Sequence, residues 1–144
     1  MFTDCQIRVA TDADSADFLV VYQRIFPEKN ITAQSIADIK NEPATVFVVG
    51  SPIRGFLYFW TLLDEIQIID LGVLPEFRRQ GIAQKLLEHL KSQITTDQQI
   101  FLEVRASNTA AMRLYEENGF QKISERKKYY ADGEDAWVYN LSPR

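Results

Sequence analysis

The sequence has few residues of the kinds that bind metal ions or form disulfide bonds. It contains one cysteine and one histidine in 144 residues. A lone cysteine excludes a disulfide framework and favours a reducing compartment, and this pair of residues cannot supply a zinc site. We therefore predict no metal site, a cytoplasmic location and no special role for the thiol of Cys5.

Long apolar runs and an excess of basic charge are also missing. No run is long enough to cross a bilayer, and residues 1–10 lack the apolar core of a signal peptide. The net charge of −4 has the wrong sign for a surface that binds nucleic acid. We therefore predict neither a membrane nor a nucleic-acid partner.

The composition that remains is typical of a globular domain, with 46% hydrophobic and 25% charged residues. The length suits one domain over residues 1–144. Strand and helix patterns mix, and one strand–helix–strand crossover lies in the middle, which indicates an α/β sheet with helices on its faces. We expect strands at 6–10, 45–49, 53–63, 66–73, 100–105, 120–130 and 137–141, a hairpin turn at Asp132-Gly133, and helices after the caps at 11–14 and Thr32, at 82–94 and at 109–118.

The stretch 66–90 reads as a buried strand, a glycine-containing turn and an amphipathic helix. The first amides of a helix have no partner within it, and with the helix dipole they form an anion site. Gly81 would let a phosphate approach the main chain, Ala83 is also small, and Arg78 and Arg79 supply positive charge. This turn is either a pyrophosphate cradle or an ordinary strand–turn–helix with solvated arginines.

The pattern Arg78-x-x-Gly81-x-Ala83 resembles the signature of the GCN5-related N-acetyltransferase (GNAT) family. The resemblance implies a mixed, mostly antiparallel twisted sheet of six to seven strands with about four helices, and acetyl-CoA as cosubstrate. It also implies that main-chain amides near the end of the preceding strand meet the oxyanion and pantetheine. The cofactor contacts that it implies are Leu71, Gly72, Val73, Arg78, Arg79, Gln80, Gly81, Ile82, Ala83, Gln84 and Asn108.

The region from Glu103 to Phe120, with its Glu-Val-Arg-x-Ser-Asn, Leu-Tyr-Glu and Gly-Phe elements, resembles the RimI-type N-terminal alanine acetyltransferases. The likeness covers roughly residues 56–140. It implies that Glu103 is the general base, that Tyr115 is the general acid, and that Tyr129 and Tyr130 line a peptide groove. The implied acceptor is the N-terminal alanine of a ribosomal protein.

The sequence departs from this subfamily at two places. Asp70-Leu71-Gly72-Val73 stands where Asn-Ile-Ala-Val is common, and the usual Pro-Trp-Ser segment is missing from the first helix region. One interpretation of Gly72 is that it permits a bulge in the strand. The other is that a glycine is simply tolerated there for packing. His89 falls on the outer face of its helix, so we give it no role.

The chemistry-bearing residues also have plainer interpretations. Glu103 lies inside an apolar strand, where a carboxylate facing a cleft could take a proton, or could form an ordinary ion pair with Arg105 or Lys122. Tyr115 follows Asn108 by about two helical turns and shares its face. It is a proton donor at neutral pH, or a core tyrosine.

The proton chemistry favours an N-terminal amine as acceptor. An α-amino group has a pKa of about 7.7–8.0, against about 10.4 for lysine, so a carboxylate deprotonates it more readily. Two alternatives stay open. One is a small-molecule amine acetyltransferase acting on polyamines or aminosugars, which the acidity of the chain suits, and the other is a non-catalytic acyl-CoA-binding adapter.

Overall fold

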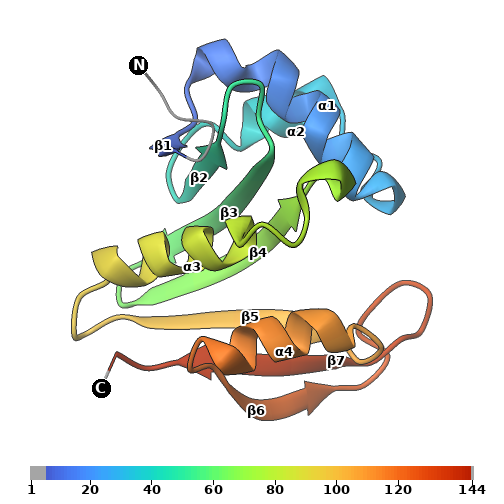
Figure 1. The fold of residues 1–144 in the computed structure, drawn as a ribbon. Helices are drawn as coiled ribbons and strands as arrows, with labels where there is room; N and C mark the ends of the chain where they lie inside the picture. The colour runs from blue at the N-terminus through green and yellow to red at the C-terminus, as the bar shows by residue number, and fades with distance from the viewer. Residues whose placement is uncertain (1–5, 144) are drawn as a thin grey trace. The chain divides into compact units, whose positions relative to one another are not determined.

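The computed structural model describes residues 6–143, so the prediction for Cys5 lies outside the described residues. The strands and α-helices of this part are arranged as a mixed α/β fold (Figure 1). Their bounds are β1 (Ile7–Val9), α1 (Ser15–Ile25), α2 (Ala33–Asp38), β2 (Ala44–Val49), β3 (Gly55–Leu62), β4 (Glu65–Val73), α3 (Ile82–Gln93), β5 (Gln99–Arg105), α4 (Thr109–Glu117), β6 (Gln121–Arg126) and β7 (Ala136–Leu141). Three short 3-10 helices are η1 (Asp12–Asp14), η2 (Pro27–Lys29) and η3 (Pro75–Phe77).

The strands hydrogen-bond in the order β1-β2-β3-β4-β5-β7-β6. β4 and β5 run parallel, as the strand–helix–strand crossover through α3 requires, whereas β1–β2, β2–β3, β5–β7 and β6–β7 are antiparallel. This confirms the predicted mixed, mostly antiparallel sheet with about four helices. No helix among residues 6–143 is both long and apolar enough to span a membrane.

The contacts divide the chain into two compact units. The first unit consists of the residues up to Thr61 together with Ile68–Gln93, and the second of Leu62–Gln67 together with the residues from Ile94 onward. Strand β4 contributes its first residues to the second unit and the rest to the first.

In the first unit, α1 and α3 cover opposite faces of the strands. The ring of Tyr22 in α1 lies 4.7 Å from that of Phe56 in β3, and Phe56 pairs with Val48 of β2. Phe47 is the neighbour of Val48 and therefore points to the other face, where its ring lies 4.7 Å from that of His89 in α3. The prediction that His89 lies on the outer helix face is therefore wrong, because the ring packs on the sheet.

The C-terminal end of α1 comes very close to β4. A Cβ on Gly72 would lie 2.7 Å from Cγ2 of Ile25, a distance that real Cβ atoms do not show, and 3.0 Å from Cε2 of Phe26, which is tighter than ordinary contact. The glycine at this position therefore lets the end of α1 approach β4 closely.

In the second unit, α4 packs against one face of β5 and β7. The hydroxyl of Tyr139 in β7 donates to Glu116 of α4 at 2.7 Å, and a Cβ on Gly119, just after α4, would lie 3.4 Å from Leu141. Tyr139 pairs with Leu102 of β5, so Leu102 faces the same helix.

The closing strand is shorter than predicted. β6 ends at Arg126, so residues 127–130 do not continue the strand as predicted. The predicted turn at Asp132-Gly133 is present, because the amide of Gly133 donates to the carbonyl of Tyr130 at 2.9 Å. The backbone turns into the left-handed region at Lys128, with φ of 50°, and the amide of Lys128 donates to Oδ1 of Asp135 at 2.8 Å. This side-chain acceptor captures an amide that the ladder would otherwise have used.

We predict that Gly72→Ala lowers the free energy of unfolding by about 1–3 kcal/mol, because the added carbon overpacks the contact with Ile25 and Phe26. Urea unfolding followed by circular dichroism measures this loss. In an Ile25→Ala background, which removes two of the crowding atoms, the same substitution should cost clearly less. An equal cost in both backgrounds would contradict the packing account.

Candidate active site

The turn before α3 leaves its main chain open. Arg79 and Gly81 both have left-handed backbones, with φ of 65° and 77°. A Cβ built on Gly81 would meet nothing within 4 Å, whereas one on Gly55 or Gly72 would be crowded. The amide of Lys85 bonds the carbonyl of Gly81 at 3.0 Å, so the helix begins directly at this residue. An anion can therefore reach the start of a twelve-residue helix without meeting a side chain of the turn.

The other predicted cofactor residues of the first unit differ in which of their groups could contact a diphosphate. Arg78 donates from Nε to the carbonyl of Val73 at 3.0 Å, so it ties the turn to the end of β4. The side chain of Gln84 donates to Glu88 one turn along α3, and Ile82 is 2% exposed. The groups that best fit a diphosphate here are therefore the main chain and the exposed side chains of Arg79 and Gln80. Ala83 is half-buried and small enough to leave room for it. Leu71 and Gly72 belong to the end of β4.

Glu103 is the centre of the second group of predicted residues. It lies half-buried on β5, where Nε2 of Gln67 and the hydroxyl of Tyr129 each donate to its carboxylate at 3.2 Å. Gln67 belongs to the short part of β4 that pairs with β5. Both carboxylate oxygens are thus oriented by neutral donors, which leaves the group able to accept a proton.

The ion-pair partners expected for Glu103 are engaged elsewhere. Arg105 bonds Asp132 at 2.9 Å and Glu134 at 3.0 Å, and the ammonium of Lys122 lies 4.0 Å from the centre of the Trp137 ring. Of the two interpretations of Glu103, the contacts of these two cations therefore do not favour the ordinary ion pair.

Arg105 instead organises the connection 127–135. Its guanidinium stacks 4.0 Å from the ring centre of Tyr130, and the rings of Tyr129 and Tyr130 meet edge to face at 5.1 Å. Glu134 also accepts from the amide of Ser107 at 2.8 Å. The connection is therefore fixed to β5 and to the start of α4, which holds the Tyr129 hydroxyl at Glu103.

The two tyrosines of this connection have raised pKa values. Burial raises the pKa of Tyr129, and the charge of Glu103 raises it further because a phenolate would face a carboxylate. Burial raises the pKa of Tyr130 to about 12, although the charge of Arg105 opposes this. Both hydroxyls stay protonated at neutral pH, and that of Tyr129 donates to Glu103.

Tyr115 and Asn108 belong to α4 and its N-terminal cap. Tyr115 is in α4, 7% exposed, with its ring 5.4 Å from that of Phe120. Asn108 caps α4, because its side chain accepts from the amide of Ala111 at 3.1 Å. The cap is a role that sequence reasoning did not assign to Asn108.

Glu103 and Tyr115 approach β5 from opposite faces. Leu102 faces α4, so Glu103 beside it points away from the helix that carries Tyr115. The register between β4 and β5 consists of three pairs and ends at Gln67 with Phe101.

The sequence reasoning missed a polar cluster around Asp70. This carboxylate is 7% exposed, and Lys29 donates to its two oxygens at 2.6 and 2.8 Å. The hydroxyl of buried Tyr22 also donates to it. Burial raises the pKa of Asp70, while the charge of Lys29 opposes the rise. The available signal was that Asp70 is the one charged residue within the apolar stretch 66–73.

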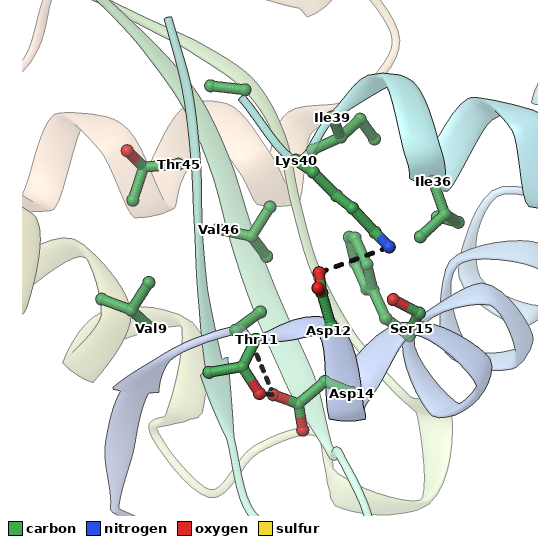
Figure 2. A pocket seen from close by; sticks show the side chains of 13 residues that line it. Val9, Thr11, Asp12, Asp14, Ser15, Ile36, Ile39, Lys40, Thr45 and Val46 are labelled. Carbon is green, nitrogen blue, oxygen red and sulfur yellow. Dashed lines mark hydrogen bonds and ion pairs between the residues drawn. The ribbon is translucent and has the colours of Figure 1, made fainter. Parts of the chain in front are cut away.

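A pocket of about 140 Å³ lies in the first unit, with residues of β1, η1, α2 and β2 among its walls. An ion pair of 3.3 Å between Lys40 and Asp12 crosses it (Figure 2). None of the predicted site residues lines this pocket. Among residues 6–143 no three His, Cys, Asp or Glu side chains come together in a way that could hold a metal ion.

Known proteins share this fold and parts of this sequence. The crystal structure of the ribosomal-protein-S18-alanine N-acetyltransferase from Escherichia coli matches with a TM-score of 0.84 over 94% of this chain and 92% of that chain, at 32% identity. An N-alpha-acetyltransferase of Saccharolobus solfataricus is 43% identical over 81 residues, which are 54% of this chain and 48% of that protein. The ribosomal protein bS18-alanine N-acetyltransferase of Escherichia coli is 42% identical over 97 residues, 62% of this chain and 64% of that protein.

These likenesses define the fold as that of the N-acetyltransferases. In sequence, the chain spans about half to two thirds of the length of these curated relatives. Residues 11–120 match the model of the acetyltransferase (GNAT) family, and the chain belongs to this family.

We predict that Glu103→Gln lowers the pKa of Tyr129, because the substitution removes the negative charge that opposes the phenolate. The pKa should stay above the ordinary value of about 10, since burial persists. Difference absorbance during an alkaline titration measures the change, and Tyr129→Phe identifies the signal. An unchanged Tyr129 titration in Glu103→Gln would contradict the hydrogen bond between them.

Proposed function

We propose that this protein is an acetyl-CoA-dependent N-acetyltransferase whose acceptor is the N-terminal amine of a protein, most specifically the N-terminal alanine of a ribosomal protein. The observation that carries the proposal is the Glu103 carboxylate, half-buried and held by the neutral donors Gln67 and Tyr129. Membership of the acetyltransferase family supplies the reaction class.

The open turn supports acetyl-CoA as the acyl donor. When bound, this cosubstrate supplies the thioester whose acetyl group is transferred. The main chain at Gly81 and the start of α3 would bind its diphosphate, and the exposed Arg79 would add positive charge. The side-chain oxygen of Asn108 caps α4, so its side-chain NH₂ group would contact the cofactor. The main-chain amides of Leu71–Val73 would donate hydrogen bonds to the oxyanion.

Two proton transfers fall to two side chains. Glu103 would take the proton of the acceptor ammonium, directly or through a water molecule. Tyr115, which belongs to the helix on the other face of β5, would protonate the departing thiolate.

The acceptor class rests on proton chemistry and on the relatives. An α-amine loses its proton about 10²–10³-fold more readily than a lysine, so a carboxylate base suits it. The Escherichia coli relative is named for the N-terminal alanine of ribosomal protein bS18. Tyr129 and Tyr130 would border the peptide, with Tyr129 also contacting the base.

We also propose that residues 1–144 act as one catalytic domain, because the family match includes residues of both units.

We predict that the protein acetylates peptides with a free N-terminal alanine, and that Glu103→Gln lowers kcat/KM about 10²–10⁴-fold, because general-base catalysis has this magnitude. Tyr115→Phe should also lower kcat, and both variants should still bind acetyl-CoA. Mass spectrometry of peptide products and calorimetry with acetyl-CoA measure the two properties. The matched control is Glu117→Gln, which changes an exposed glutamate of α4 and should leave kcat/KM unchanged.

The same assay separates the alternatives. Turnover with spermidine or glucosamine, and none with N-terminal peptides, would establish a small-molecule amine acetyltransferase instead. Binding of acetyl-CoA without turnover of any amine would establish an adapter. Acetylation of an internal lysine alone would refute the proposed acceptor.

We predict that Gly81→Ala weakens acetyl-CoA binding about tenfold, because the new methyl group covers the main chain where the diphosphate would lie. Gly133→Ala is the matched control, since Gly133 also has a positive φ and open space around a built Cβ. Both variants should lose similar stability, but only Gly81→Ala should raise the Kd measured by calorimetry. Equal Kd values in the two variants would exclude the cradle.

A further inference from the structure

The pocket of the first unit combines apolar walls with a pair of charges. Its volume is about 140 Å³, and an apolar cavity of about 150 Å³ is large enough to bind benzene. Three of the residues that line it, Phe18, Ile36 and Val46, are buried hydrophobic residues of the core. The apolar part of the pocket therefore matches a group no larger than one phenyl ring.

The charged side chains at this pocket are of two kinds. Asp14 is fixed, because Arg8 and the amide of Thr11 each donate to its Oδ2 at 2.8 Å. Lys40 and Asp12 instead reach toward each other across the pocket, with 41% and 86% of their side chains exposed (Figure 2). An exposed ion pair contributes little to stability. These two charges can therefore separate at small cost and accept other partners.

The pair matches the two charges of an α-amino acid. In such a molecule an ammonium and a carboxylate are attached to the carbon that carries the side chain. The ammonium can pair with Asp12 and the carboxylate with Lys40, while the side chain enters the apolar part of the pocket. Binding would thus replace one ion pair by two charge-assisted contacts, so no charge would lose its partner.

We propose that this pocket binds a free α-amino acid whose apolar side chain is no larger than a phenyl ring, with Asp12 and Lys40 as its ionic contacts. None of the residues assigned to acetyl transfer lines the pocket. The proposal therefore stands or falls separately from the proposed function, and its test needs no measurement of activity.

A methyl NMR titration with L-phenylalanine tests the proposal and locates the ligand. The methyl signals of Ile36 and Val46 should shift with a Kd of about 0.1–1 mM, a range suited to a ligand of this size. The methyl signals of Ile100 in the second unit should stay unchanged. Shifts confined to residues outside the pocket would mean that the amino acid binds elsewhere, for instance as an acceptor amine, and would overturn the proposal. The absence of any shift would overturn it as well.

Analogues that each differ in one group test the assigned contacts. Phenethylamine has no carboxylate, 3-phenylpropanoate has no ammonium, and L-tryptophan has a larger side chain. Each should bind at least about tenfold more weakly than L-phenylalanine, since each loses one ionic contact or exceeds the apolar space. If any of the three binds as tightly as L-phenylalanine, the proposed ligand class is wrong.

Single substitutions remove the two ionic contacts one at a time. Asp12→Asn and Lys40→Met should each weaken binding of L-phenylalanine at least about tenfold, with little change in thermal stability because the pair is exposed. The matched control is Lys127→Met, which removes another exposed lysine, paired with Glu125 at 2.9 Å outside the pocket. It should leave the Kd unchanged. Equal Kd values in all three variants would overturn the assignment.

Exchanging the two charges tests how they orient the ligand. The double variant Asp12→Lys with Lys40→Asp keeps one charge of each sign but reverses their places. The ammonium, carboxylate and side chain of the ligand would then meet the pocket in mirror-image order. The preference between L- and D-phenylalanine should therefore be inverted relative to the wild type. An unchanged preference would show that these charges do not orient the ligand, and it would overturn the proposal.

Discussion

The buried Asp70 carboxylate ties β4 to the end of α1 and to η2 in the first unit. A charge placed in a strand between apolar neighbours needs a counter-charge nearby, and Lys29 reaches it only if η2 lies directly against β4. That placement fixes the end of α1, and the end of α1 in turn leaves room only for glycine at position 72. The position of the first helix thus depends on one titratable group of a strand.

A second constraint comes from the short register between β4 and β5. Three residue pairs, from Glu65–Gln99 to Gln67–Phe101, join the strands. Glu103 and Tyr115 reach β5 from its two faces.

Local patterns predicted most of the fold because they report local physics. The strand at 66–73, the helix after Gly81 and the helix ended by Gly119 all follow from periodicity and backbone preference. The strand expected at 120–130 failed at Lys128, whose amide is taken by Asp135. The prediction that His89 faces outward was wrong, because helix periodicity does not determine whether a residue at the border of the apolar face contacts the sheet or the solvent. Contacts between distant residues decided both errors.

The candidate site shows the same division. Family motifs pointed to Glu103, but its partners Gln67 and Tyr129 come from a neighbouring strand and a connection whose course no local pattern specifies. The two departures from the family pattern, Asp70 and Gly72, looked unrelated in the sequence. In the structure both face the same segment, one by attracting Lys29 and the other by making room for Ile25 and Phe26. They form a single adaptation, because the close approach that needs the glycine also brings Lys29 within reach of the carboxylate.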